Sequence, residues 1–197
     1  MTARSTDTEV HDIFIDRWSP RAFDGTPLSD AEVRTLLDAA RWAPSAFNAQ
    51  PWRLLYAVHG DANWDRFLNL LIPFNRDWAR NASLLIFFVS ATTSHDKPSY
   101  THSFDTGAAW MSLALQAHLM GLHAHGMAGY DHDAARGDLG IPDDYRIEAA
   151  AVVGRRADPS ILPEPLRERE IPSDRKPIEE IAFAGNFPGM GPRLTAS

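Results

Sequence analysis

The sequence contains no cysteine. This absence excludes disulfides, a thiolate nucleophile, a cysteine-ligated zinc site and an iron–sulfur cluster, so any redox chemistry must come from a bound organic cofactor. The chain also lacks an excess of basic residues, because its formal net charge is −7 and its pI is near 5.5. Most nucleic-acid binders depend on the release of counterions by a basic surface. We therefore expect no nucleic-acid partner.

Long apolar segments are missing as well. The longest run, from Leu84 to Val89, is far shorter than the roughly 20 residues that a membrane-spanning helix needs. The first residues, MTARSTDTEVHD, hold no apolar stretch of the kind that secretory signals carry. We therefore predict a cytoplasmic protein without a membrane partner.

Several catalytic signatures are also absent: G-x-G-x-x-G, the Walker A loop, the G-x-S-x-G elbow and H-E-x-x-H. His123 and His125 would share one face of a strand, and His132 follows them closely. Because further ligands are missing, these histidines make a poor metal site. We interpret them as ordinary polar residues near a pocket and predict no metal.

The length of 197 residues suits one domain with a sizeable core. We predict a single domain over residues 1–197 with a core at about 11–183. Proline and charge dominate residues 155–177, which indicates an extended arm on the surface. Residues 184–197 are predicted to be a flexible tail.

Hydrophobic periodicity predicts most of the elements. Ser29 and Glu32 form a capping-box pattern before a helix over Asp30–Ala43. Alternation predicts a strand over Trp52–Val58. Similar patterns predict helices over Thr8–Ile15, from Trp64 to a stop near Pro73, and over Asp105–Leu122, and strands over Ser83–Ala91, His123–Gly129, Arg146–Val153 and, at a sheet edge, Ile178–Phe183. The segment 92–103 is predicted to be a mobile loop or short insert over a site.

The predicted helix over Asp105–Leu122 is apolar on nearly all sides. Such a helix must be covered on all sides, and in a short chain one way to cover it is a second copy of the same chain.

Two short segments suggest a ligand site. In RWAPSAFNAQPW (41–52), Pro44 and Pro51 pin a loop of small and amide side chains that could hold a flat polar molecule. In RWSPRAFDG (17–25), Arg17, Ser19 and Arg21 suit a phosphate, because arginine offers a planar fork of donors. The alternative for the second segment is a pair of solvated surface arginines.

Six segments together resemble the FMN-dependent nitroreductase family in order and spacing, from about residue 11 to 183. They are RWSPRAFDG, PSAFNAQPW, PFNRDW, FDTGAAWMSLALQAHLMGL, GMAGYD and DRKPIEEI. The resemblance implies an α+β fold with a central, mainly antiparallel sheet flanked by helices. It also implies an intertwined homodimer with FMN at the subunit interface.

The resemblance further implies a set of cofactor-binding residues. The FMN phosphate would be held by Arg17, Ser19 and Arg175, with Lys176 beside them, and Arg21 would lie near the ribityl chain and the N1/O2 edge of the flavin. The partner subunit would supply Pro44, Ser45, Ala46 and Asn48. Asn75 would bond the pyrimidine edge, and backbone N–H groups around Ala128 and Gly129 would face N5 and O4. Trp18 and Met127 complete the predicted set.

The sequence departs from the family pattern at three places. Trp18 stands where the family often has a basic or polar side chain, Trp78 where many members have a cation, and Ser173 where some have another basic residue. Arg21 would therefore bear more of the charge at N1/O2, and Arg175 and Lys176 would complete the phosphate site.

The implied activity is hydride transfer from NADH or NADPH through FMN to a nitroaromatic, a quinone or a similar small electrophile, by a ping-pong mechanism. No catalytic side chain is required. The alternatives are a specialised enzyme of the same fold, which reduces a small aldehyde or enone or removes a halogen, and a non-catalytic FMN-binding protein. Tyr100, His102 and Phe104 either line the substrate pocket or are plain packing residues.

Overall fold

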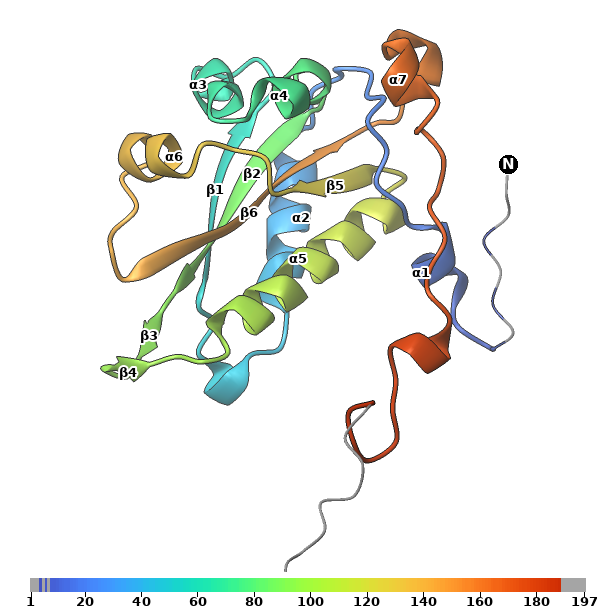
Figure 1. The fold of residues 1–197 in the computed structure, drawn as a ribbon. Helices are drawn as coiled ribbons and strands as arrows, with labels where there is room; N and C mark the ends of the chain where they lie inside the picture. Colours follow the sequence, from blue (N-terminus) through green and yellow to red (C-terminus); the bar gives the residue numbers. More distant parts are fainter. Residues whose placement is uncertain (1–3, 5, 7, 189–197) are drawn as a thin grey trace, which may run out of the picture.

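The computed structural model describes residues 4, 6 and 8–188. Residues 189–197 of the predicted flexible tail lie outside the described residues. Within the described part, a four-stranded sheet has the order β1 (Trp52–Val58), β2 (Leu84–Ala91), β6 (Tyr145–Gly154) and β5 (His123–Met127), as Figure 1 shows. Every pair of neighbours is antiparallel. The predicted α+β fold with a central antiparallel sheet is confirmed.

Strand β2 is buried on both faces, as its continuous apolar run predicts. Leu84, Ile86 and Phe88 pack on one side of the sheet, whereas Leu85 and Phe87 pack in the core on the other side. This division follows from the strand period of two residues, which sends successive side chains to opposite faces. The sheet therefore separates two hydrophobic cores.

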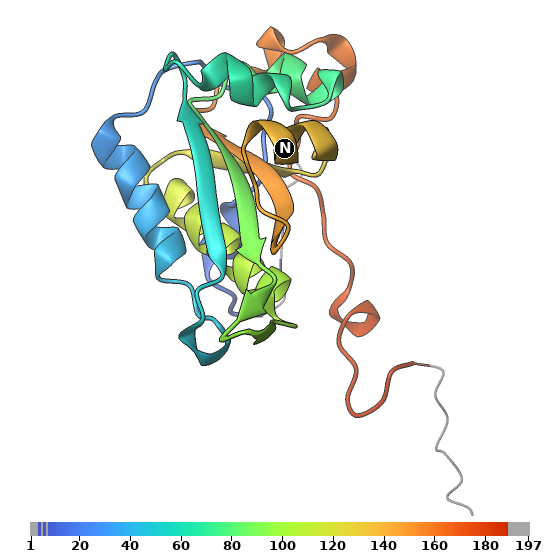
Figure 2. The same cartoon turned by 90° about the vertical axis from the view of Figure 1, so that its left-hand side faces the viewer.

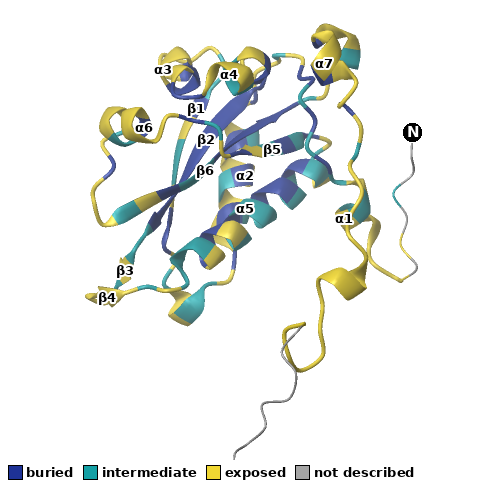
Figure 3. Cartoon of the chain, viewed as in Figure 1, coloured by how far each residue is buried: buried dark blue, intermediate teal, exposed yellow. Residues whose placement is uncertain are grey.

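Helices cover both faces of the sheet. The helices α2 (Asp30–Arg41) and α5 (His102–Leu119) pack against each other on one face. The other face carries α3 (Trp64–Asn69), α4 (Pro73–Ala79) and α6 (His132–Asp138) (Figures 1 and 2). Helix α5 buries only one side, and Figure 3 shows half-buried and exposed residues along the rest of it.

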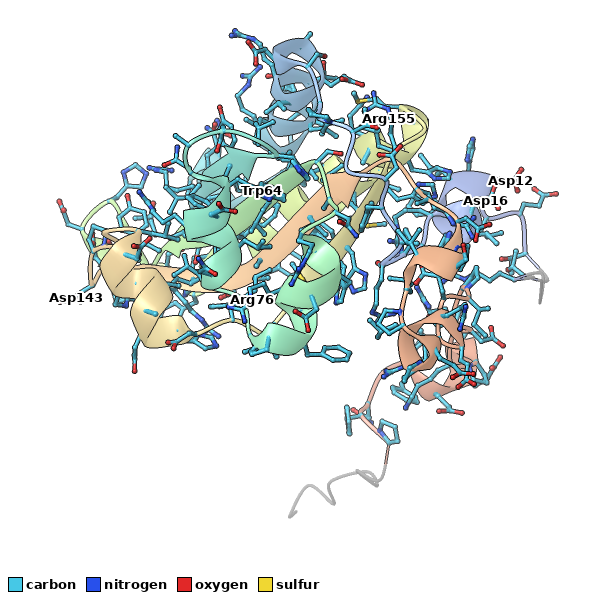
Figure 4. The ribbon with its side chains drawn as sticks, turned by 90° about the horizontal axis from the view of Figure 1, so that it is seen from above. Asp12, Asp16, Trp64, Arg76, Asp143 and Arg155 are labelled. Carbon is cyan, nitrogen blue, oxygen red and sulfur yellow. The ribbon has the colours of Figure 1, made fainter. Side chains whose placement is uncertain are left out.

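The start of α2 is fixed as predicted. The side chain of Ser29 accepts a hydrogen bond from the backbone N–H of Glu32, whose carboxylate accepts one from the backbone of Ser29, which completes the capping box. The other carboxylate oxygen of Glu32 lies 2.6 Å from Nη2 of Arg155. Arg155 directly follows β6, where Figure 4 labels it. The pair thus ties the end of β6 to the first turn of α2.

A β-bulge interrupts the pairing of β2 with β6. Phe88 lies opposite Ala149, but Val89 lies opposite Ile147, so Glu148 is the extra residue. An extra residue of this kind turns its side chain away from the regular alternation. The carboxylate of Glu148 accepts hydrogen bonds from Ser90 (2.5 Å) and Ser103 (2.8 Å).

Some elements differ from the predictions. Pro73 begins α4 instead of only ending the helix before it, because proline fits the first turn of a helix, where its missing N–H is not needed. The helix α6 was not predicted. The first helix, α1, covers only Asp12–Asp16, and α5 begins three residues earlier than expected. Residues 92–103 include a two-stranded hairpin, β3 (Thr93–Ser94) and β4 (Lys97–Pro98).

The predicted edge strand over Ile178–Phe183 is wrong. Ile178–Glu180 forms the 3₁₀ helix η3, and the residues around it do not reach the sheet. A strand needs a neighbouring edge for its hydrogen bonds, and here the chain leaves the body after η2 (Pro159–Ile161) and α7 (Glu164–Arg167). Figure 2 shows this C-terminal arm extending away from the sheet.

Candidate functional site

A cavity of about 490 Å³ lies between two segments far apart in the sequence. One wall is the segment that follows α1 together with strand β5, and the other wall is the start of the C-terminal arm. Figures 1 and 4 show α1 and this arm side by side. The lining residues are Arg4, Arg17, Trp18, Ser19, Arg21, His125, Glu168, Arg169, Ile171, Ser173 and Arg175. Five of them are arginines and one is a carboxylate.

The cavity brings together the residues predicted from the sequence to bind a phosphate. Arg17 Nη1 lies 3.4 Å from Ser19 Oγ, and Arg175 Nη1 donates to the backbone carbonyl of Ser173 at 3.2 Å. Trp18 also lines the cavity, although its side chain is buried beneath the guanidinium of Arg156 at 5.1 Å. Lys176 is not brought into it, because its ammonium group is exposed and lies 3.6 Å from Glu180.

The electrostatics of the cavity favour an anion. Burial, followed by repulsion from Arg4 and Arg175, lowers the pKa of Arg17. Burial also lowers the pKa of Arg21, with Glu170 acting in the opposite direction. Guanidiniums stay protonated in proteins, so these shifts express the cost of burying positive charge, to which the neighbouring guanidiniums add at Arg17. A dianionic phosphate would relieve this cost, and the residues present fit such a group.

Glu170 holds the segment after α1 in place and was missed by the sequence analysis. Its Oε1 accepts hydrogen bonds from the backbone N–H groups of Arg21 (2.8 Å) and Ala22 (2.9 Å). Its side chain is only 4% exposed, and its Oε2 has no hydrogen-bond partner among the described residues. In the sequence it stands in the charged run RERE, which is typical of a solvated face. Only the fold reveals that this glutamate turns inward.

Two aromatic side chains connect the cavity to helix α4. The ring of His125 lies 4.7 Å from the ring of Trp78, and the guanidinium of Arg21 lies 6.0 Å from the same ring. His125 Nδ1 lies 2.9 Å from the backbone carbonyl of Pro20. Because a carbonyl only accepts, Nδ1 must carry the hydrogen in this contact. Burial lowers the pKa of His125 to about 4, so the ring is neutral near pH 7.

Asn75 lies on α4, three residues before Trp78. Its Nδ2 donates to the backbone carbonyl of Gly129 at 3.0 Å, and the backbone N–H of Ile72 donates to the same carbonyl at 3.2 Å. Asn75 therefore bonds to the segment that follows β5, whereas the partner expected from the sequence is the pyrimidine edge of the flavin. A Cβ on Gly129 would lie 2.5 Å from Asn75 Nδ2, so only glycine permits this approach. Met127 is buried, whereas Ala128 is exposed next to it.

The predicted binding loop after α2 lies at a different place in the same chain. Figure 1 shows it at the lower end of α2, away from α7 and from the segment after α1. Pro44 and Asn48 are exposed there, and the backbone N–H of Ala46 donates to the buried carboxylate of Asp105 at 3.2 Å. The chain therefore does not bring this loop together with the arginine cavity.

The loop is held in an unusual backbone conformation. Phe47, Asn48 and Gln50 have φ values of 51°, 54° and 46°, in the left-handed region that non-glycine residues seldom adopt. The side chain of Phe47 is 99% exposed. Strained residues of this kind often occur at binding sites, and an almost fully exposed phenylalanine is consistent with a binding surface.

The three predicted substrate residues do not form one pocket in the described chain. Tyr100 and Phe104 are 94% and 82% exposed. His102 is half-buried, and its Nδ1 lies 2.7 Å from Ser90 Oγ and 3.3 Å from Glu148 Oε1. Its environment is thus that of a packing residue at the start of α5.

A larger cavity of about 790 Å³ lies between α2 and β1. Its charged lining residues are three carboxylates and two guanidiniums, from Asp30, Asp38, Asp61, Arg34 and Arg41. The cavity contains none of the residues that the sequence singled out for binding. Because the chemistry of the smaller cavity is far more specific, we place the candidate site there.

Among the helices that the structure describes, none is long and apolar enough to cross a membrane.

The chain is similar to known proteins over most of its length. The model of the nitroreductase family matches residues 15–76 and 65–155. A crystal structure described as an oxidoreductase containing FMN is 51% identical, with a TM-score of 0.91, and the alignment covers 95% of this chain and 97% of that one.

Two relatives known by sequence extend this similarity. An uncharacterised 15.4 kDa protein of Mycolicibacterium smegmatis is 31% identical over 130 residues, which are 64% of this chain and 88% of that protein. An NADH dehydrogenase of Thermus thermophilus is 25% identical over 201 residues, covering 86% of this chain and 92% of that enzyme. The family match extends from residue 15 to residue 155, through the segment after α1, the loop after α2, Asn75 and Gly129. The chain therefore belongs to the nitroreductase family.

Proposed function

We propose that this protein is an FMN-dependent oxidoreductase that uses NADH or NADPH to reduce a nitroaromatic, a quinone or a similar small electrophile. The observation that carries the proposal is the arginine-lined cavity, together with the Asn75–Gly129 hydrogen bond on the same helix as Trp78. Its similarity to an oxidoreductase containing FMN supports the identity of the cofactor. The use of NADH or NADPH as the electron donor is consistent with the cytoplasmic location that the sequence predicts.

In this proposal, Arg17, Ser19 and Arg175 bind the phosphate of FMN by charge-assisted hydrogen bonds. Arg21 lies between this cavity and Trp78, where its positive charge would stabilise the N1/O2 edge of the flavin. Asn75 has one N–H and its carbonyl oxygen left for the pyrimidine edge, because Gly129 accepts only one of its donors. The backbone N–H groups at Ala128 and Gly129 would orient N5 and O4.

Bound FMN would supply the chemistry of hydride transfer from NADH or NADPH to the second substrate. The residues of this chain bind and orient, and none is assigned a proton transfer. Two neutral groups beside the site fit this role: His125, whose pKa is lowered to about 4 by burial, and Asn75. The acceptor then occupies the place of the nicotinamide, which is the ping-pong order.

We further propose that the active form is a homodimer. The loop after α2, which contains Pro44, Ser45, Ala46 and Asn48, lies away from α7 and from the segment after α1 of its own chain, so a second copy is needed to bring such a loop to the arginine cavity. The uncovered side of α5, with Phe104 82% exposed, supplies an apolar face for that copy. Analytical ultracentrifugation should give a molecular mass of about twice the 21.9 kDa of one chain. A monomer that retains FMN fully would contradict the shared site.

Steady-state kinetics test the activity. Purified protein should be yellow and should release FMN, not FAD, on heating. Double-reciprocal plots for NADH at several fixed concentrations of a quinone should give parallel lines, as a ping-pong order requires. Intersecting lines would reject that order, and protein that cannot be loaded with FMN would reject the proposed function. A flavin that is bound but never turned over would instead indicate a non-catalytic binding protein.

A further inference from the structure

Arg4 joins the two walls of the arginine cavity. Its Nη1 donates to the backbone carbonyls of Ile15 and Arg17, both at 2.9 Å, in the wall that follows α1. Its Nε donates to the carbonyl of Ser173 at 2.8 Å, in the C-terminal arm. One guanidinium thus connects the segment after α1 to Ser173, which lies 169 positions after Arg4 in the sequence.

The donors of Arg4 are not all used by these contacts. An arginine side chain has five N–H groups, one on Nε and two on each terminal nitrogen. Nε and Nη1 are occupied by the three backbone carbonyls, whereas Nη2 makes no hydrogen bond among the described residues. Arg4 lines the cavity, so its two remaining donors are available to a ligand there.

The charge around Arg4 is not neutralised by ion pairs. Within residues 4, 6 and 8–188, no salt bridge includes Arg4, Arg17 or Arg175. Burial and the nearby Arg175 lower the pKa of Arg4, and Asp174 opposes them. Three guanidiniums held close together in this way are stabilised by a bound anion and destabilised without one.

We propose that Arg4 binds the phosphate of FMN through Nη2 and at the same time locks the segment after α1 to the C-terminal arm. This inference rests on the proposed function, because it takes FMN as the ligand. It adds a fourth residue to the predicted phosphate group of Arg17, Ser19 and Arg175. It also makes the cavity selective for the phosphorylated form of the flavin over riboflavin.

The test compares two flavins that differ only in the phosphate. Dissociation constants of FMN and riboflavin are measured by fluorescence quenching on the full-length apoprotein, for the wild type, Arg4→Ala and the control Arg34→Ala. Arg34 is an exposed arginine on α2, outside the cavity. We expect Arg4→Ala to raise the dissociation constant of FMN about tenfold, which corresponds to about 1.4 kcal/mol. The dissociation constant of riboflavin should stay within about twofold of the wild-type value. The control should change neither constant.

Two results would overturn the inference. Unchanged FMN affinity in Arg4→Ala would show that Nη2 does not reach the phosphate. An equal loss for FMN and riboflavin would show that Arg4 only maintains the fold of the cavity.

A second probe separates this inference from the proposed function. Inorganic phosphate should raise the melting temperature of the wild-type apoprotein more than that of Arg4→Ala, with Arg34→Ala like the wild type. If the wild type fails to bind FMN, the proposed function is rejected, and the phosphate measurement still decides whether Arg4 belongs to an anion site. Equal protection of the wild type and Arg4→Ala by phosphate would overturn the role of Arg4.

Discussion

The neutral state of His125 makes stability depend on pH in a predictable way. Burial, opposed by the hydrogen bond to Pro20 and assisted by the charge of Arg21, lowers the pKa of this side chain from 6.5 to about 4. The unfolded chain therefore binds a proton below pH 6.5, whereas the folded protein does not bind it until about pH 4. The stability due to neutral His125 is fully present above pH 6.5 and is lost as the pH falls toward 4.

The size of the effect follows from the two pKa values. A difference of one pKa unit corresponds to about 1.4 kcal/mol, so the full loss is about 3 kcal/mol. Between pH 8 and pH 5 the folded protein should lose about 2 kcal/mol of its free energy of unfolding through this residue. Other groups also titrate in this range, and burial likewise lowers the pKa of His123. A variant must therefore isolate His125.

The assay is urea unfolding at pH 8 and pH 5, at one protein concentration, for the wild type and His125→Asn. The asparagine amide can still donate to the carbonyl of Pro20 but does not titrate. We expect the loss of stability on acidification to be about 2 kcal/mol smaller in this variant. The control is His95→Asn, at an exposed position with φ 50°, which asparagine tolerates. Equal losses in the wild type and His125→Asn would refute the reasoning.

Two further predictions concern the frame of the site. Glu170→Ala leaves two backbone N–H groups without their acceptor and should lower the free energy of unfolding, measured by urea unfolding, by about 2–4 kcal/mol. The control Glu168→Ala changes an exposed neighbour and should alter this free energy by less than about 0.5 kcal/mol. Similar effects of the two substitutions would contradict the inward position of Glu170. Gly129→Ala places a methyl group 2.5 Å from Asn75 Nδ2, so it should lower the free energy of unfolding by about 1–3 kcal/mol and weaken the binding of FMN. Unchanged binding and stability would show that Asn75 can move freely.

The sheet could be predicted from the sequence because its signals are local. The apolar run of β2 and the alternation in β1 determine strands without knowledge of their neighbours, and both strands lie where the pattern places them. The capping box at Ser29 likewise depends on two residues that are close in the sequence. The segment around Ile178 carries no such local signal. Whether an apolar segment becomes a strand depends on the presence of a neighbouring sheet edge, which lies elsewhere in the sequence.

The candidate site could be predicted only in part, for the same reason. Arg17, Ser19 and Arg175 follow from family motifs, and the fold brings them to one cavity. Arg4 and Glu170 carry no such motif, because each stands in a polar segment that has the composition of a solvated surface. Their roles arise from contacts with residues more than ten positions away, which no local pattern contains.

The most direct test of the proposed function is anaerobic addition of NADH and, separately, NADPH to the FMN-loaded protein while the flavin absorbance near 450 nm is recorded. We predict that at least one of the two donors bleaches the bound flavin with about one equivalent per FMN, and that a quinone then restores the colour. A stably bound FMN that neither nucleotide reduces would contradict the account.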